Sequence, residues 1–233
     1  MMAQYQIVST RLLSDELVHQ LQAIGISVTQ HDFISTRIQL PKNILRSTIQ
    51  NVVILTSKTA VKAWMQIIAS WQLRSDQYRI YCLSEGTQNL VLSNGLVIAG
   101  TATNSASLAD EILSDKNIRN VTLVCGNRRR DELPDKLKSG GVAVHEIVAY
   151  TTELTPIAIS VSMDGILFYS PSGVESFLAK NSVGSAVAFC LGQTTAEYAL
   201  KMGFNTTRIA EAHTPSALVK AVLDYYSNKT IHA

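Results

Sequence analysis

The segment Val53-Ile54-Leu55-Thr56-Ser57-Lys58-Thr59-Ala60-Val61-Lys62 carries the pattern that decides the fold. A short run of β-branched and aliphatic residues is followed at once by hydroxyl residues, and then by apolar residues at a helical spacing. This order is typical of a buried parallel strand that leads into a helix through a short loop. The same order recurs over residues 166–175, which read Ile-Leu-Phe-Tyr-Ser-Pro-Ser-Gly-Val-Glu, and Ser57 and Ser170 lie 113 residues apart.

Three further matches keep a similar spacing, so the chain contains an internal repeat. The matched residues are Cys82, Leu83, Thr87 and Gly95 with Cys190, Leu191, Thr195 and Gly203, 108 residues apart; Leu108 with Leu218, 110 apart; and Asp15, Leu21 and Gly25 with Asp131, Leu137 and Gly141, 116 apart. Within each half, short β-rich runs alternate with amphipathic stretches of helical length. The pattern predicts two doubly wound α/β domains with parallel sheets, of the flavodoxin or Rossmann type.

Two long extended runs, Phe33–Leu40 and Val142–Thr152, suggest how the chain passes between the domains. We interpret them as a two-stranded connector. The first domain is then discontinuous, residues 1–34 with 153–233, and the second is residues 35–152. A single cut near residue 118 is the alternative, but it leaves the N-terminal unit without a partner in its own half.

Helix ends can also be predicted from residue type. Gly95 and Gly203 each follow a short helical pattern, as a glycine just after a helix does. Hydroxyl residues that commonly cap helix starts are Ser14, Thr59, Ser105, Ser172 and Thr214.

Composition limits the function classes. The 233 residues are 46% hydrophobic and 16% charged with a net charge of +2, which suits buried parallel strands and implies no broad basic face for nucleic acid or membrane. The N-terminus lacks a signal-peptide pattern, and no apolar run is long enough to span a membrane. Cys82, Cys125 and Cys190 form no CxxC pair, so we expect free buried thiols in a cytoplasmic protein.

Ligands of open parallel sheets bind beyond the carboxyl ends of the strands, where helix N-termini attract anions. The loops predicted there are rich in hydroxyls, glycine and amides and poor in acids: Thr10-Arg11, Thr56-Ser57, Ser84–Thr87, Gly126-Asn127, Ser170–Gly173 and Gly192–Thr195. Taken singly, most of these serines and threonines are explained equally well as helix caps. Nucleotide, zinc-protease and hydrolase motifs are absent, and the five histidines show no metal-ligand spacing. The residues alone therefore predict two domains around an anion-friendly, hydroxyl-rich cleft, with no metal or nucleotide signature.

The same loops resemble the uroporphyrinogen-III synthase family across nearly the whole chain. Individual motifs are short, and their order makes the match specific. The matching segments are Thr10-Arg11; Leu55-Thr56-Ser57 with Ala60-Val61; Cys125-Gly126-Asn127 with Arg130; Val148–Thr151 around Tyr150; Phe168–Val174; Leu191–Ala196; and Thr214-Pro215 with Leu218. Three positions depart from the family pattern: Leu12 and Gln193 stand where proline is common, and Glu85 adds an acid to the Ser84–Thr87 loop.

The resemblance implies an enzyme that dehydrates and cyclises hydroxymethylbilane in a cleft between two α/β domains, with inversion of the terminal pyrrole and no cofactor. It implies Tyr150 as the catalytic acid. The residues that it implies for substrate binding are Arg11, Thr56, Ser57, Thr87, Gly126, Asn127, Arg130, Ser170, Pro171, Ser172, Gly173, Gly192, Gln193, Thr194 and Thr195. We further expect a monomer that makes transient contact with the preceding enzyme. A tetrapyrrole-binding module without turnover and an unrelated α/β enzyme stay open as alternatives.

Overall fold

The computed structural model describes residues 4–41, 46–84, 86–129 and 131–231. The chain divides into two compact units, Met1–Ser35 with Glu153–Ala233 (unit 1) and Thr36–Thr152 (unit 2). Unit 1 contains strands β1 (Tyr5–Ser9), β2 (Ile26–Gln30), β9 (Gly165–Phe168), β10 (Val187–Cys190) and β11 (Thr207–Ile209), and helices α1 (Asp15–Ala23), α6 (Pro171–Leu178), α7 (Gln193–Lys201) and α8 (Pro215–Ile231).

Unit 2 holds the second sheet. Its strands are β4 (Val52–Leu55), β5 (Arg79–Leu83), β6 (Val97–Ala102), β7 (Asn120–Gly126) and β8 (Ala143–Leu154); its helices are α2 (Lys58–Trp71), α3 (Gly86–Ser93), α4 (Ser105–Ser114) and α5 (Glu132–Ser139), with short 3-10 turns η1 (Arg46–Thr48) and η2 (Ser75–Gln77). Strand β3 (Ile34–Ile38) joins the edge of this sheet beside β8.

The two sheets share one topology. The strand order is β11-β10-β9-β1-β2 in unit 1 and β6-β5-β4-β7-β8 in unit 2, with β3 added beyond β8. The pairs within each of these five-strand series are parallel. Matching strands therefore come from matching parts of the repeat, and the predicted fold class of two parallel α/β sheets is confirmed.

The two chain crossings between the units pair with each other. Thr155 N donates to Phe33 O, and Gln39 N donates to Ala149 O, so β3 and β8 run antiparallel. The hydroxyls of Thr36 and Thr152 lie 3.3 Å apart between these two bonds. This arrangement is a two-stranded connector.

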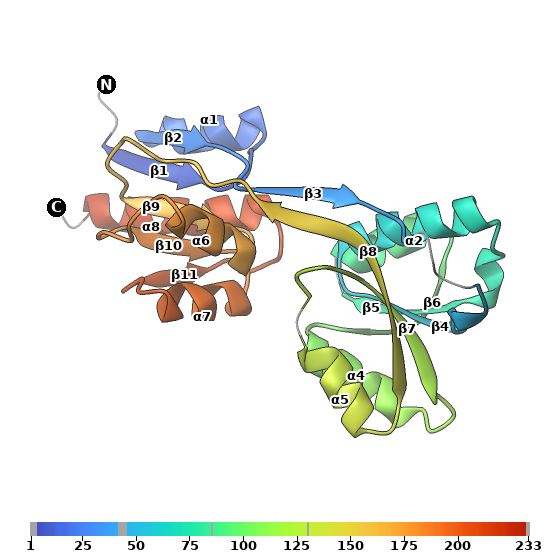
Figure 1. Cartoon of the computed structure of the whole chain (residues 1–233). Helices are drawn as coiled ribbons and strands as arrows, with labels where there is room; N and C mark the ends of the chain where they lie inside the picture. The colour runs from blue at the N-terminus through green and yellow to red at the C-terminus, as the bar shows by residue number, and fades with distance from the viewer. Residues whose placement is uncertain (1–3, 42–45, 85, 130, 232–233) are drawn as a thin grey trace. The chain divides into compact units, whose positions relative to one another are not determined.

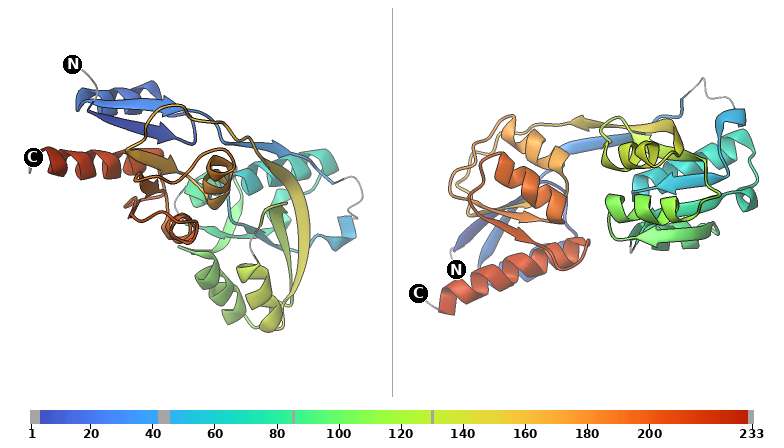
Figure 2. Two further views of the ribbon diagram at one scale, coloured as in Figure 1. Left: turned by 60° about the vertical axis from the view of Figure 1, so that its left-hand side comes forward. Right: turned by 90° about the horizontal axis from the view of Figure 1, so that it is seen from below.

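Helices cover both faces of each sheet, which explains the continuous apolar strands. In unit 1, α1 and α8 pack on one face and α6 and α7 on the other (Figures 1 and 2). In unit 2, α2 and α3 cover one face and α4 and α5 the other. Every residue of β4, β9 and β10 is buried, and each fully buried aliphatic or aromatic side chain contributes about 1.5–3 kcal/mol.

Helix starts differ in part from the prediction. Ser14 and Thr214 precede α1 and α8 as expected; Thr214 Oγ1 accepts from Ala217 N, whereas the side chain of Ser14 makes no capping hydrogen bond. The predictions at Thr59, Ser105 and Ser172 are wrong by one or two residues. The N-caps are instead Ser57, Asn104 and Ser170, because the capping residue is the last one with extended dihedral angles, while the predicted residues already lie within the helices. Gly95 and Gly203 have positive φ angles of 70° and 102°, as predicted for helix ends.

Candidate functional site

Three neighbouring strands of unit 1 deliver their loops to one edge of the sheet. The strands are β10, β9 and β1, and because they are parallel, their carboxyl ends lie side by side. The residues there are Ser9, which ends β1, and Thr10 and Arg11 after it; Tyr169, Ser170, Pro171, Ser172 and Gly173 after β9; and Gly192, Gln193, Thr194 and Thr195 after β10. The structure thus brings together the residues predicted for this half of the chain.

The loop after β9 starts helix α6. The Ser170 hydroxyl accepts from Gly173 N at 3.3 Å, and Pro171 occupies the first turn, where its missing N–H costs nothing. Ser170 is therefore a cap, and its own hydroxyl proton can still be donated to a ligand. Ser172 and Pro171 are half-buried in the same turn.

The loop after β10 starts helix α7 at Gly192, which has no side chain to cap the helix. A Cβ atom on Gly192 would lie 2.7 Å from Nε2 of His213, so the imidazole lies directly against this backbone. Gln193 donates from Nε2 to Glu197 Oε1 at 2.9 Å, which gives a polar residue a helical partner where the family commonly has proline. Thr194 is exposed beside it, whereas Thr195 is buried.

Unit 2 presents the matching edge from β7, β4 and β5. Gly126 ends β7 and Asn127 follows it, Thr56 and Ser57 follow β4, and Gly86 and Thr87 open α3 after β5. Thr87 is buried to a similar degree as its repeat partner Thr195, with 8% and 5% exposed. Glu85 and Arg130 lie outside the described residues.

Tyr150 of β8 lies against this second edge, where it contacts Ser57 and Gly126. Its hydroxyl is 3.2 Å from Ser57 Oγ, and Ser57 Oγ also accepts from Ala60 N at 3.0 Å. The ring covers Gly126, where a Cβ would come within 2.3 Å of Tyr150 Cε2. Burial raises the pKa of Tyr150, and the hydrogen bond with Ser57 opposes this shift only in part. The phenol is therefore a neutral proton donor at physiological pH.

Asn127 fixes the strand that carries Tyr150. Its Oδ1 accepts from Thr152 N at 2.8 Å, and its backbone N–H donates to Tyr150 O at 3.2 Å. Asn127 was predicted to bind substrate, but its side-chain oxygen already has a backbone partner. Asn127 is exposed, and its Nδ2 makes only a long 3.4 Å contact with Thr152 O.

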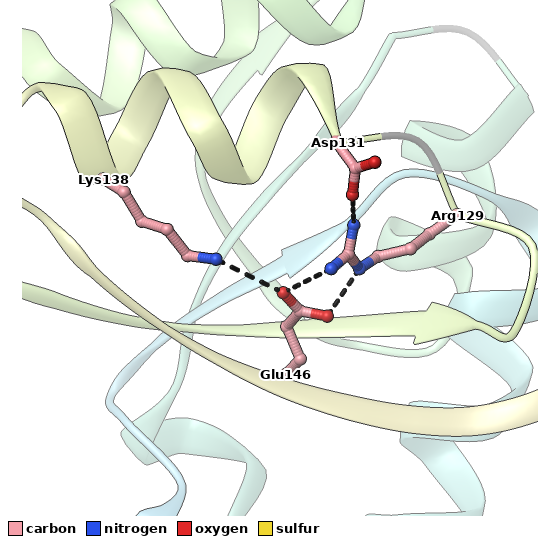
Figure 3. Close-up of polar contacts among 4 residues, drawn as sticks. All are labelled: Arg129, Asp131, Lys138 and Glu146. Carbon is pink, nitrogen blue, oxygen red and sulfur yellow. Dashed lines mark hydrogen bonds and ion pairs between the residues drawn. The ribbon is translucent and has the colours of Figure 1, made fainter.

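An ion cluster supports the loop that follows Asn127 (Figure 3). Arg129 contacts Glu146 of β8 through Nε and, at 2.8 Å, through Nη2, and it also pairs with Asp131 before α5. Lys138 Nζ lies 3.8 Å from Glu146 Oε1. Hydrogen bonds with Glu146 and Asp131 raise the pKa of Arg129. Arg129, one of the three arginines at positions 128–130, therefore has a structural role.

Sequence reasoning missed several residues at these edges. Tyr169 and the buried Ser9 form a second hydroxyl pair, with their oxygens 3.3 Å apart. Lys58, at the start of α2, places Nζ 3.0 Å from where a Cβ on Gly86 would lie. Tyr169 lies inside the repeated segment, but an aromatic residue after a strand is usually packing; no sequence signal identifies Ser9, because it ends an apolar run.

Other classes of site find no support in the described ranges. They contain no group of three or more histidine, cysteine or acidic residues that could hold a metal ion. No helix in these ranges is both long and apolar enough to cross a bilayer.

Comparison with known proteins points to the family that the sequence resembles. The sequence model described as uroporphyrinogen-III synthase HemD matches residues 15–220. The uroporphyrinogen-III synthase of Saccharomyces cerevisiae is 25% identical over 214 residues, which cover 77% of this chain and 78% of the yeast protein.

Solved structures share the fold. The Helicobacter pylori uroporphyrinogen-III synthetase superposes with a TM-score of 0.66 at 16% identity, over 95% of this chain and 100% of that one. A mutant uroporphyrinogen III synthase from Thermus thermophilus gives a TM-score of 0.72 at 13% identity, over 96% and 98% of the two chains. With the family model matching most of its length, the chain belongs to the uroporphyrinogen-III synthase family.

Proposed function

We propose that this protein catalyses the synthesis of uroporphyrinogen III from hydroxymethylbilane, as a cyclising hydro-lyase of tetrapyrrole and heme biosynthesis. Family membership supports the reaction. The observation that supports its location is the neutral phenol of Tyr150, paired with Ser57 at a strand edge rich in hydroxyls and backbone amides.

The substrate is a flexible octacarboxylate, and the two strand edges offer it anion-binding groups. Helix N-termini present unpaired N–H groups and the positive ends of helix dipoles. Arg11 adds an exposed cation in unit 1, and Lys58 adds one in unit 2. The residues proposed to contact carboxylates are Arg11, Thr56, Ser57, Thr87, Gly126, Ser170, Pro171, Ser172, Gly173, Gly192, Gln193, Thr194 and Thr195, with Asn127 as a support and Arg130 proposed from sequence alone.

The chemistry is redox-neutral. The C–O bond of the hydroxymethyl group breaks, and the hydroxide leaves as water once it receives a proton. The resulting azafulvenium cation is attacked by the substituted carbon of the terminal pyrrole, which gives a spiro intermediate. This intermediate fragments and recloses with that ring inverted, and loss of a ring proton restores aromaticity and balances the proton spent.

Tyr150 is the proposed donor of that proton. Its raised pKa keeps the phenol protonated, and Ser57 holds the oxygen in place. Because ionisation is assisted by the pyrrole and is intrinsically easy, positioning of the chain contributes more than acid catalysis. Since unassisted closure gives the uninverted isomer, we also propose that the monomeric protein receives the substrate by transient contact with the enzyme that makes it.

An isomer assay tests the function. Fresh hydroxymethylbilane is supplied, the products are oxidised, and the uroporphyrin isomers are separated by chromatography. Isomer III in excess over a protein-free control supports the synthase. Isomer I alone from folded protein would rule out the synthase activity and favour a tetrapyrrole-binding module without turnover.

Tyr150→Phe tests the acid. We expect kcat to fall about 10- to 100-fold, at the low end for general acids, and the share of isomer I to rise. Tyr78→Phe is the matched control, because Tyr78 is a buried tyrosine of unit 2 that packs edge-on against Trp64. Full turnover and an unchanged isomer ratio in Tyr150→Phe would remove its proposed role.

A further inference from the structure

We propose that Ser9 and Tyr169 form a positioning pair that holds the Arg11 loop in the conformation that binds a substrate carboxylate. This inference rests on the proposed function, because it gives Arg11 an anionic ligand. Neither Ser9 nor Tyr169 is among the residues that the family resemblance assigns to the site.

The first observation is the contact geometry. Ser9 ends β1 and is fully buried, and Tyr169 follows the neighbouring strand β9. Their oxygens are 3.3 Å apart. Ser9 Oγ donates to Arg11 O at 2.5 Å and lies 3.5 Å from Arg11 N, so one buried hydroxyl contacts both backbone polar groups of Arg11.

The second observation is the direction of these bonds. A carbonyl oxygen carries no proton, so the single Ser9 proton goes to Arg11 O, and the Ser9 oxygen must accept from Tyr169. The Tyr169 proton is thereby committed to Ser9. Burial raises the pKa of Tyr169, against the opposing effects of the Ser9 bond and the Arg11 charge, so the proton stays on the phenol.

In the Ser57–Tyr150 pair of unit 2, by contrast, the tyrosine proton is available to another acceptor. Ser57 Oγ accepts from Ala60 N, and its own proton has the Tyr150 oxygen as an acceptor. Tyr150 can then offer its proton to a ligand. The same two residue types therefore make an acid in unit 2 and a support in unit 1.

The third observation is what surrounds Arg11. Thr10 donates from both its backbone N–H and its Oγ1 to Leu167 O, at 3.1 and 2.8 Å. On the other side, Leu13 N donates to Gln30 Oε1 at 2.8 Å. Arg11 itself is exposed and forms no ion pair with another described residue. Because the backbone of Arg11 is fixed, only its side chain loses conformational freedom when the guanidinium binds a carboxylate.

Binding of uroporphyrin III, used as an octacarboxylate probe, tests the coupling between Tyr169 and Arg11. Fluorescence titration of the full chain compares wild type, Arg11→Met, Tyr169→Phe and the double variant. We expect Kd to rise about tenfold in Arg11→Met and about threefold in Tyr169→Phe, the sizes of one charged and one neutral hydrogen bond. The double variant should match Arg11→Met alone, since Tyr169 acts through Arg11.

Amide hydrogen exchange of the unliganded protein gives a second readout. Exchange in residues 10–13 should accelerate in Tyr169→Phe and more so in Ser9→Ala, with residues 26–30 unchanged. Tyr198→Phe, in helix α7 of the same unit, is the matched control and should change neither readout. If Tyr169→Phe does not fold, Ser9→Ala combined with Arg11→Met completes the same cycle.

Three results would overturn the proposal: an unchanged Kd in Tyr169→Phe, single effects that multiply in the double variant, or wild type that does not bind the probe. The isomer assay on the same preparation decides separately whether the protein is a synthase. Isomer III from wild type together with any of these three results would leave the proposed function intact and remove the role of Ser9 and Tyr169.

Discussion

Gly126 of unit 2 and Thr10 of unit 1 are equivalent residues with opposite roles. Gly126 ends β7 and Thr10 follows the matching strand β1; the two lie 116 residues apart, the spacing that relates Asp15 to Asp131. At Gly126 the missing side chain leaves room for the ring of Tyr150. At Thr10 a side chain fills the position and donates to Leu167 O. One copy of the repeat thus admits an aromatic side chain, and the other closes the same position.

This difference indicates how the two halves of a duplicated fold can take different functions. In unit 2 the open position lets a phenol reach the serine that caps α2. In unit 1 the closed position holds a loop whose cation is exposed. On this basis we expect substitutions in unit 2 to affect kcat and the isomer ratio, and substitutions in unit 1 to affect KM.

The largest expected effect comes from closing the open position with Gly126→Ala. The added Cβ would lie 2.3 Å from Cε2 and 2.7 Å from Cδ2 of Tyr150, so the ring must move away from Ser57. A displacement of this size is expected to lower kcat/KM about 100-fold. Steady-state kinetics and the isomer ratio measure it.

Gly100→Ala is the matched control. Its Cβ would meet the ring of Tyr81 at 2.6 Å, a similar clash elsewhere in unit 2. Both variants should lose about 1–3 kcal/mol of unfolding free energy through overpacking. Equal losses of kcat/KM in the two folded variants would show that stability, and not the position of Tyr150, causes the effect.

The counterpart in unit 1 is Thr10→Val, which keeps the branched shape and removes the Oγ1 bond to Leu167 O. We expect the unfolding free energy to fall by about 1 kcal/mol, and KM to rise about threefold, because the support of the Arg11 loop is weakened. kcat should stay at the wild-type value. A fall in kcat with unchanged KM would contradict the division of work between the units.

The side chains that support the site loops offer a third test. Ion pairs support the loop after Asn127 in unit 2, whereas hydroxyl groups support the Arg11 loop in unit 1. Arg129→Met removes the contacts with Glu146 and Asp131, and it leaves Glu146 with the more distant Lys138 (Figure 3). The pairs are part-exposed, so we expect a loss of only about 1 kcal/mol by denaturant titration. The difference from wild type should shrink in 1 M salt, since salt screens such pairs. A loss that does not depend on salt would assign the effect of Arg129 to packing.

Sequence and structure agree most closely where pattern determines geometry. The repeat and the strand–helix alternation predict two parallel sheets, because a buried parallel strand has a continuous apolar signature, as in Val52–Leu55 and Gly165–Phe168. Most of the predicted site residues that the structure describes lie where adjacent parallel strands end, whereas Tyr150 lies within β8. Their contacts with substrate stay predictions.

Contacts between distant residues could not be predicted. Ser9 and Tyr169 are 160 residues apart, and only the adjacency of β1 and β9 brings them together. The capping role of Ser57 was missed because Thr59, two residues later, is as good a cap by residue type, and the dihedral angles decide between them. Likewise, a run of three arginines does not show that Arg129 is the one that binds Glu146.

The smallest expected effect concerns the three buried thiols, which lie at or next to the carboxyl ends of β5, β7 and β10. Burial raises the pKa of Cys82 and of Cys125 in unit 2 to about 11, and that of Cys190 in unit 1 to about 12. At pH 8 the folded protein should therefore react with a thiol reagent far more slowly than the unfolded chain, and Cys190 should react last, as mass spectrometry of alkylated peptides can measure.

Between pH 9 and pH 11 the native state keeps thiol protons that the unfolded chain releases, so the unfolding free energy falls as pH rises, and none of this contribution is lost below pH 9. If Cys190 reacted before Cys125, local opening of unit 1, and not burial of the thiol, would set the order of reaction.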